Sequence, residues 1–564
     1  MNETMDPVLE EKMHVLNEGF LRSGYEVICE AKETFDAMVT MRDGVRLHTY
    51  ISLPEAGEVH PVIVTRSCYP HLEYKYRIYA REFAKRGFGF VWQYCRGREE
   101  SEGDFVPNLQ ERNDSLDTVE WLLSQPWCGK IGYYGHSYTA MIGWSMADKA
   151  EGKVASMFLE EYGTDRFASV YQKGAFRHDI ITAWSMENGS KPITATNALY
   201  IKSCLYRPQT EVDVALWGEK NETYRQYVTS PHESDELWQT GWWKQLREIP
   251  GKTTIPVCIM SGWYDHHHGS SRLTWERLSK EAKQHSRFLV GGWNHSLRTC
   301  MPGRTTDHAD VSDIPRVLAW FDQTLRRTDA PVEPGVSYYV IGADRWLSEE
   351  PETIERVYYP DVTWGDEFSY GMSTVASDVM GAVSYRYNPG DPVLSVGGDS
   401  LFKTKEQIGS LPVGLAGERA DVISFATEPL MSPMTICGKM QVKLRIKSDA
   451  FDTAFTAKLI EETKEGEAYH IRSSITTILS DDTEERPYAP GLETMVTIDL
   501  WDICYELAEG SRLRLDISSS NFPEYHIHGN VAEPWAETSK QKIAKQTILT
   551  GGSEGTRLIV PVLV

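Results

Sequence analysis

Residues 130–146 have the sequence KIGYYGHSYTAMIGWSM, and this stretch decides the fold. Residues 131–134 have the apolar character of a short buried strand, a sharp turn follows, and a helical pattern begins after the turn. A serine on a tight turn from strand to helix presents its hydroxyl clear of the backbone, within reach of a base and a substrate carbonyl. The usual pattern is G-x-S-x-G, and Thr139 departs from it. The stretch predicts a nucleophile at Ser137, with an ordinary β-turn-α connection as the alternative.

Composition and charge limit the classes of protein to which the chain can belong. It has 564 residues, 41% apolar and 25% charged, as expected of a globular protein with two or three domains. The net charge of −23 and the lack of a Lys/Arg stripe argue against a nucleic-acid partner. No run of about 18 apolar residues predicts a membrane span, and the N-terminus has no signal-peptide pattern. Nine scattered cysteines without C-x-x-C spacing predict reduced thiols and a cytoplasmic protein.

The first half of the chain alternates apolar strands with amphipathic helices. Residues 37–54 predict two strands joined at Arg42-Asp43-Gly44, because Asp-Gly is a strong hairpin signal. Residues 165–250 interrupt the alternation with helical, aromatic-rich sequence, which indicates an inserted subdomain. Since alternating strands and helices form parallel sheets covered on both faces, the sequence predicts an α/β domain. Its further strands are expected at 61–65, 88–94, 131–134, 154–159, 255–261 and 288–290.

The sequence period changes to two beyond residue 335. Residues 331–335, PVEPG, look like a linker. Apolar and polar residues alternate after it, for example in 440–447, 496–500 and 513–517. Strands with one buried face, separated by turns and almost without helical pattern, are typical of antiparallel sandwiches. The second domain is therefore predicted to be an all-β sandwich.

An acid and a base follow two of the predicted strands. Strand 255–261 leads into Asp265, and strand 288–290 leads into His295. In an α/β-hydrolase sheet the catalytic residues have the chain order Ser, acid, His, and the acid and base lie on loops after later strands. Asp265 would hold the tautomer of His295, and His295 would take the proton of Ser137. Taken singly, Asp265 could be a turn residue and His295 a buried histidine, but the ordered set favours a triad.

Two hydrogen-bond donors are expected to hold the oxyanion of the reaction. One is the backbone N–H of Tyr138, which follows the nucleophile, and the other should lie after strand 61–65. No HGGG motif is present there, so the phenol of Tyr69 is the candidate, with a packed aromatic ring as the alternative. The histidine run 266–268 lacks metal-ligand spacing, so no metal and no cofactor are predicted. A pocket-lining role for one of these histidines stays open.

Several stretches together resemble the CocE/NonD hydrolases, the group that contains cocaine esterase, α-amino-acid ester hydrolases and X-Pro dipeptidyl-peptidases. The resemblance covers roughly residues 36–560. It is carried by VTMRDGVRLHTYISLP (39–54), TRSCY (65–69), Arg96-Gly97 with Ser101-Glu102-Gly103, QPWCGKIGYYGHSY (125–138), KGAF (173–176), SGWYD (261–265), GGWNH (291–295) and SSSNFP (518–523).

The resemblance implies an α/β-hydrolase fold with an inserted helical cap, followed by an all-β jelly-roll domain. The expected parts are an N-terminal extension (1–35), the catalytic domain (36–164 and 251–330), the helical cap (165–250) and the C-terminal jelly-roll β-sandwich (335–564). The resemblance also implies Ser137, Asp265 and His295 as the catalytic triad, and Tyr69 with the Tyr138 N–H as the oxyanion site.

Two departures from the family pattern bear on function. Ala140 stands where the family usually has glycine, and this change should not remove the nucleophile. Relatives that recognise a free α-amino group carry carboxylates just after the triad aspartate, and here those positions are His267 and His268. This difference weakens, without excluding, a preference for α-amino substrates.

The sequence thus predicts a serine hydrolase that cleaves carboxylic esters, with activated amides as further substrates, through an acyl-enzyme. Phe176, Trp184 and Trp263 are candidate pocket residues, with core packing as the alternative. An X-Pro dipeptidyl-peptidase, with Glu160 or Glu161 as anchor for the substrate ammonium, and an α-amino-acid ester hydrolase stay open. A degenerate hydrolase used as a binding module is the non-enzymatic alternative. The expected partner is a small ester or a short peptide, and a homo-oligomer stays open.

Overall fold

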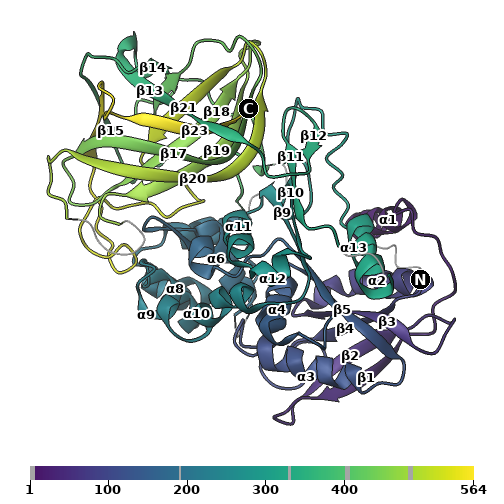
Figure 1. The fold of residues 1–564 in the computed structure, drawn as a ribbon. Coiled ribbons are helices and arrows are strands. Elements are labelled where there is room, and N and C mark those ends of the chain that lie inside the picture. Colours follow the sequence, from purple (N-terminus) through teal and green to yellow (C-terminus); the bar gives the residue numbers. More distant parts are fainter. Residues whose placement is uncertain (1–6, 190–191, 328–331, 401–406, 481–486) are drawn as a thin grey trace.

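The computed structural model describes residues 7–189, 192–327, 332–400, 407–480 and 487–564. They form an α/β domain, a helical cap inserted in it, and an all-β domain at the C-terminal end of the chain. In Figure 1 the green and yellow β-domain lies at the upper left, and the purple and blue strands of the α/β domain lie at the lower right. The predicted fold class is confirmed.

One sheet of ten strands runs through the described part of the α/β domain. Its strands are β1 (Phe35–Thr40), β2 (Arg46–Ser52), β3 (His60–Ser67), β4 (Gly89–Tyr94), β5 (Cys128–His136), β6 (Ser156–Glu160), β9 (Val257–Tyr264), β10 (Arg287–Asn294), β11 (Gly335–Val340) and β12 (Arg345–Leu347). They lie in the order β1-β2-β4-β3-β5-β6-β9-β10-β11-β12, with a parallel centre from β4 to β11. All the strands that the sequence predicts for this domain are present.

Apolar side chains cover both faces of this sheet, and helices pack on each face. On β3, Ile63 points into one core with Phe83 and Phe321, whereas Val62 and Val64 point into the other. A strand that is apolar on both faces suits a parallel sheet buried between helices. The first core is built with α1 (Pro7–Leu21), α2 (Glu73–Lys85) and α13 (Ile314–Phe321), the second with α3 (Glu111–Leu123) and α4 (Tyr138–Met146).

The helical cap lies between strands β6 and β9, as predicted. Its helices are α5 (Arg166–Val170), α6 (His178–Glu187), α7 (Asn197–Leu205), α8 (Glu222–Val228), α9 (Glu236–Gln239) and α10 (Gly241–Glu248). They pack through aromatic rings, and Tyr227 stacks on Trp238 with centroids 5.9 Å apart. A hairpin of β7 (Tyr171–Gln172) and β8 (Ala175–Phe176), which the sequence pattern does not indicate, joins α5 to α6. Within the described residues, none of the helices combines the length and apolar character needed to cross a lipid bilayer.

The boundary between the two domains differs from the prediction. The sequence places the start of the second domain at residue 335, but β11 pairs in parallel with β10 and so belongs to the α/β sheet. The alternation in GVSYYV suits an outer strand of either sheet, and periodicity alone does not separate the two cases. Just after β11, the Ile341 N–H donates to the Cys504 carbonyl (3.0 Å), and the Ile341 carbonyl accepts from the Glu506 N–H (2.8 Å). These bonds join the end of the α/β sheet to the β-domain.

The β-domain consists of two sheets that share the long strand β13 (Thr353–Asp366). The alternation predicted for 440–447 is present in β17 (Met434–Ser448), where Met440, Val442 and Leu444 are buried and the residues between them are half-buried. The predicted all-β architecture is confirmed. The other strands are β14 (Ser369–Ser373), β15 (Gly381–Tyr387), β16 (Ile423–Ala426), β18 (Ala454–Glu462), β19 (Ala468–Thr477), β20 (Thr494–Leu507), β21 (Arg512–Ser518), β22 (Ala544–Thr550) and β23 (Arg557–Leu563).

Two cysteines of the β-domain differ from the prediction of reduced thiols. Cys437 on β17 and Cys504 on β20 lie opposite each other in the sheet and form a disulfide. They are 67 positions apart in the chain, and strand register, which the sequence does not reveal, brings them together. The prediction that all nine cysteines are reduced is therefore wrong for this pair. The other seven carry no disulfide in the described part of the chain.

Candidate active site

Ser137 lies on the turn between strand β5 and helix α4. Its φ is 58°, in the left-handed region that non-glycine residues seldom adopt. The turn is tight, because a Cβ atom on Gly135 would collide with the Thr139 carbonyl. Thr139 itself closes the turn: its hydroxyl accepts a hydrogen bond from the His136 N–H (2.6 Å) and donates one to the His136 carbonyl (2.8 Å). The local sequence thus holds Ser137 in the strained geometry of a nucleophile elbow.

The structure brings the three predicted triad side chains together. The Ser137 hydroxyl oxygen lies 2.9 Å from His295 Nε2, and His295 Nδ1 lies 2.8 Å from Asp265 Oδ1. Asp265 follows β9 and His295 follows β10, so both stand with Ser137 at the carboxyl edge of the parallel strands. Burial would raise the pKa of Asp265, but His295 and a hydrogen bond with Glu161 hold that pKa well below its usual value. Asp265 is therefore a carboxylate that can orient the imidazole.

The two predicted oxyanion donors lie side by side. The rings of Tyr69 and Tyr138 form an edge-to-face contact with centroids 6.2 Å apart. The Tyr138 hydroxyl accepts from the Asn108 N–H (2.8 Å) and donates to Glu111 Oε1 (3.1 Å). Its backbone N–H stands at the first position of α4, where helix N–H groups lack intrahelical partners, so it can serve the site. The Trp184 indole donates to the Tyr69 hydroxyl (3.3 Å), and burial raises the pKa of Tyr69 well above its usual value. Tyr69 is thus a neutral phenol that can donate its own proton to an acceptor.

The structure places one of the three predicted pocket residues beside the oxyanion candidates and the other two in the core. Trp184 is half-buried and stacks on the Tyr138 ring at 5.9 Å. Trp263 is 1% exposed, and its indole donates to a main-chain carbonyl of β11. Phe176 has no exposed surface and packs against Tyr171, Tyr224 and Trp535. The prediction of a pocket-lining role is wrong for Phe176 and Trp263, because side chains enclosed on all sides cannot contact a substrate.

Two of the three histidines after Asp265 lie against the triad. His266 Nδ1 is 3.3 Å from Asp265 Oδ1, and its ring centroid is 4.3 Å from that of His295. His267 Nδ1 contacts the Ser169 hydroxyl of helix α5 at 3.0 Å. Burial lowers the pKa of both His266 and His267 well below the usual value, so both are neutral near pH 7.

One group of side chains in the described residues has the proximity that a metal site needs. Ligand atoms of Asp265, His266 and His295 lie within 4.8 Å of one another. The contact of 2.8 Å between His295 and Asp265 is the length of an N–H···O hydrogen bond. Hydrogen bonding therefore accounts for the proximity of Asp265 and His295, and the absence of a metal stays a prediction.

The third histidine connects the site to the β-domain. His268 begins helix α11 (His268–Arg277), and its Nε2 lies 3.1 Å from Oδ1 of Asp502 on β20. Burial would raise the pKa of Asp502, but His268 holds that pKa well below its usual value. His268 therefore has a partner in the other domain, whereas His266 and His267 face the triad and the cap.

Two glutamates at the end of β6 are placed differently from the prediction. Neither Glu160 nor Glu161 has exposed surface, so neither can anchor the ammonium group of a substrate. Glu160 Oε2 lies 3.1 Å from His136 Nδ1, beside the nucleophile. Glu161 accepts hydrogen bonds from the Gly262 N–H (3.2 Å) and from the Trp293 indole (2.9 Å). The only sequence signal for these contacts is a pair of acids at the end of an apolar strand, which is equally typical of an exposed loop.

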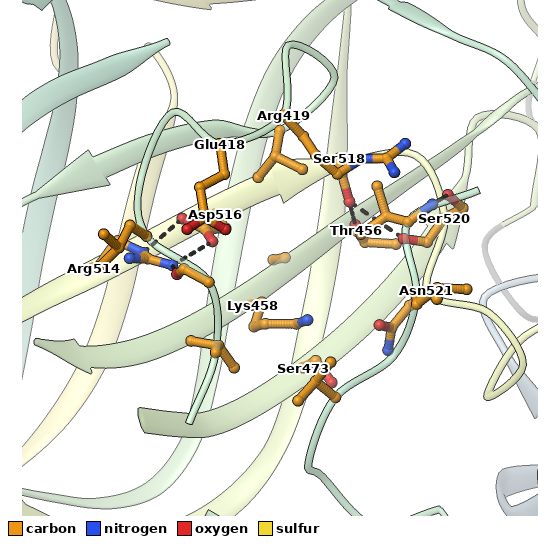
Figure 2. A pocket seen from close by; sticks show the side chains of 18 of the residues that line it. Glu418, Arg419, Thr456, Lys458, Ser473, Arg514, Asp516, Ser518, Ser520 and Asn521 are labelled. Atoms are coloured by element: carbon orange, nitrogen blue, oxygen red, sulfur yellow. Dashed lines mark hydrogen bonds and ion pairs between the residues drawn. The ribbon is translucent and has the colours of Figure 1, made fainter. Parts of the chain in front are cut away.

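A separate hollow of about 280 Å³ lies in the β-domain, and its lining contains none of the predicted site residues. Figure 2 shows its polar wall, including Arg514 and Asp516 on β21 and Lys458 on β18. Arg514 donates to Glu462 (2.7 Å) and to Asp516 (3.0 Å), so its charge is balanced locally. The hollow is thus separate from the chemistry that the sequence predicts.

Comparisons with known proteins agree with this organisation. Residues 43–297 match the X-Pro dipeptidyl-peptidase (S15) family, and residues 360–559 match the X-Pro dipeptidyl-peptidase C-terminal non-catalytic domain. Cocaine esterase of Rhodococcus sp. (strain MB1 Bresler) is 29% identical over 576 residues, which cover 94% of this chain and 98% of that protein.

Two solved structures share the fold over nearly the whole chain. One is an aminopeptidase from a marine sediment Thaumarchaeota archaeon, with a TM-score of 0.82 and 18% identity over 95% of this chain and 97% of that one. The other is an α-amino acid ester hydrolase, with a TM-score of 0.80, 20% identity and the same coverage. The family matches in both domains and the 29% identity to cocaine esterase confirm the resemblance that the sequence motifs carry: residues 43–297 have the sequence pattern of the X-Pro dipeptidyl-peptidase (S15) family, and residues 360–559 have that of its C-terminal non-catalytic domain.

Proposed function

We propose that this chain is a carboxylic ester hydrolase that works through an acyl-enzyme on Ser137. One observation carries the proposal: Ser137, His295 and Asp265 form a continuous hydrogen-bonded series with contacts of 2.9 and 2.8 Å. In this arrangement His295 takes the serine proton as the hydroxyl oxygen attacks the ester carbonyl. The Asp265 carboxylate holds Nδ1–H in place and stabilises the imidazolium that forms.

Each half-reaction passes one proton through His295. In acylation, Ser137 Oγ adds to the carbonyl carbon, and the Tyr138 N–H and the Tyr69 hydroxyl donate to the tetrahedral oxyanion. The bond to the alcohol oxygen then breaks, and the alcohol leaves with the proton from His295. In deacylation, water adds to the acyl carbonyl and gives a proton to His295. The carboxylic acid leaves as Ser137 regains that proton.

The substrate class follows from the groups around the triad. His267 and His268 stand where relatives that recognise an α-amino group carry carboxylates, and Glu160 and Glu161 are both buried. This supports esters without a free amino group over X-Pro peptides and α-amino esters. The similarity to cocaine esterase supports the same choice. The half-buried Trp184, beside Tyr69 and Tyr138, would suit an acyl or aryl group.

A substrate panel tests the proposed preference. We expect p-nitrophenyl esters, graded by acyl size and charge, to give a higher kcat/KM than an X-Pro-p-nitroanilide or a p-nitrophenyl ester of an α-amino acid. A dominant anilide rate would favour a dipeptidyl-peptidase, and a dominant rate with the amino ester would favour an α-amino-acid ester hydrolase.

Covalent labelling tests the nucleophile. A fluorophosphonate probe should label the wild type and the Ser124→Ala control, in which an exposed serine is changed, but not Ser137→Ala. A wild-type protein that neither reacts with the probe nor cleaves any ester of the panel would favour the binding-module alternative.

A further inference from the structure

Glu161 touches both strand ends that carry the other triad partners. One carboxyl oxygen accepts from the Gly262 N–H (3.2 Å), and the carbonyl of Gly262 in turn accepts from the Asp265 N–H (3.0 Å). The other carboxyl oxygen accepts from the Trp293 indole (2.9 Å), two residues before His295. The Glu161 side chain therefore ties the end of β9 to the end of β10.

The backbone of Glu161 is held as firmly as its side chain. Its φ is 53°, a left-handed conformation that costs a non-glycine residue about 1–3 kcal/mol. Its N–H donates to the Met260 carbonyl on β9 at 2.8 Å. Strain of this kind persists only where surrounding contacts impose it, and it gathers at functional sites.

The carboxyl groups of Glu161 and Asp265 are hydrogen-bonded to each other, and neither residue has exposed surface. Two carboxylates repel, so a hydrogen bond between them requires a proton on one of the two. Asp265 Oδ1 is used by His295, and no N–H or hydroxyl donor of the described residues reaches Asp265 Oδ2. Burial and the neighbouring Asp265 raise the pKa of Glu161 well above its usual value, whereas the pKa of Asp265 is lowered. A proton on Glu161 supplies the donor that Asp265 Oδ2 otherwise lacks, and it leaves the negative charge on Asp265, whose Oδ1 lies 2.8 Å from His295 Nδ1.

We infer that Glu161 is a positioning residue of the active site: as a neutral carboxylic acid it donates a hydrogen bond to Asp265 and fixes the aspartate that orients His295. The inference deepens the proposed function and rests on it. The buried pair of Glu161 and Asp265 then holds one proton and one negative charge. The single charge then remains on Asp265, where it stabilises the imidazolium formed during catalysis.

A neutral and an ionised Glu161 predict different pH profiles. An ionised Glu161 would place a second negative charge near the imidazolium, and Glu161→Gln would remove it. The acid limb of kcat/KM, which reports protonation of the catalytic base, would then move down by about one pH unit. A neutral Glu161 predicts no such movement, because glutamine is also neutral and can also donate to Asp265.

The experiment compares kcat and the pH dependence of kcat/KM for a p-nitrophenyl ester among four proteins. Glu161→Gln should keep about a third or more of the wild-type kcat and an unmoved acid limb. Glu161→Met, which fills similar space without a donor, should lose at least about tenfold in kcat because the triad is misplaced. Glu465→Gln, which changes an exposed glutamate of the β-domain, is the control and should match the wild type. An acid limb that moves in Glu161→Gln, or a wild-type kcat in Glu161→Met, would overturn the inference.

A second measurement does not depend on activity or on the methionine variant folding. Infrared difference spectra at neutral pH, wild type minus Glu161→Gln, should contain the carbonyl stretch of a protonated carboxylic acid. The same band should persist in Ser137→Ala. A difference spectrum with carboxylate bands alone would refute a neutral Glu161, even for a protein without esterase activity. If the carboxylic-acid band is present but the wild type does not react with the fluorophosphonate probe, only the proposed function is refuted.

Discussion

His268 Nε2 lies 3.1 Å from Asp502 Oδ1, and this contact joins the helix that follows the triad aspartate to strand β20 of the β-domain. The two residues are 1% and 5% exposed. A buried polar contact between domains fixes their relative position, because breaking it leaves groups without partners. The β-domain thereby supports the region next to Asp265.

Asp502→Asn should lower the free energy of unfolding at pH 7 by about 1–3 kcal/mol, because His268 loses its charged partner. The pKa of Asp502 is depressed in the folded state. Its contribution is therefore complete above the unfolded pKa of about 3.9 and is lost as the pH falls through the folded value. The difference between variant and wild type should shrink below about pH 4. Urea unfolding across pH measures it, with exposed Asp378→Asn as control, and a difference unchanged at acid pH would contradict this role.

Gly135→Ala should reduce kcat/KM for an ester at least about a hundredfold, because the added methyl collides with the Thr139 carbonyl and displaces the nucleophile turn. Gly251→Ala is the matched control, since its Cβ would meet its nearest neighbour, the Arg277 carbonyl, at 3.6 Å. Steady-state kinetics and far-UV circular dichroism of both variants measure the effect. If the kinetics of Gly135→Ala are unchanged, the nucleophile turn accommodates the added methyl group without displacing Ser137.

Thr139→Val should slow fluorophosphonate labelling of Ser137, because the hydroxyl that bonds the His136 N–H and carbonyl is lost. A buried backbone donor left without its partner costs about 1–3 kcal/mol. Thr139→Ser keeps the hydroxyl and should label at close to the wild-type rate. Equal labelling of the valine and serine variants would mean that the hydroxyl does not hold the turn.

Tyr69→Phe should lower kcat for a p-nitrophenyl ester by about 10²–10³-fold with little change in KM, because an oxyanion donor acts mainly in the transition state. Trp184→Phe removes the indole N–H that donates to the Tyr69 hydroxyl, and its effect on kcat should be smaller. If Tyr69→Phe changes only KM, the phenol binds substrate and does not stabilise the oxyanion.

Much of the fold and the triad geometry could be predicted from local signals in the sequence. Ser137, Asp265 and His295 each follow a short apolar run, and parallel strands place their carboxyl ends at one edge of the sheet. The chain order of the three residues and their positions at strand ends were therefore enough to predict that their side chains come together.

Other features depend on long-range packing, and local patterns do not encode them. The pairing of Cys437 with Cys504 and the place of β11 beside β10 are set by strand register and sheet order. Phe176 and Trp263 are aromatic residues near site motifs, but composition does not show whether an aromatic ring faces a cavity or a core. The contact of Glu161 with Asp265 joins two strand ends and has no signature within either.

The passage of the chain through β11 before it enters the β-domain determines how the protein can be divided for engineering. A fragment ending at residue 334 would leave β10, whose loop carries His295, as an open edge prone to self-association. A cut between Leu347 and Thr353 would spare the sheet but break both main-chain bonds of Ile341. Domain exchanges and fusions should therefore carry the two halves together and attach new modules at the termini.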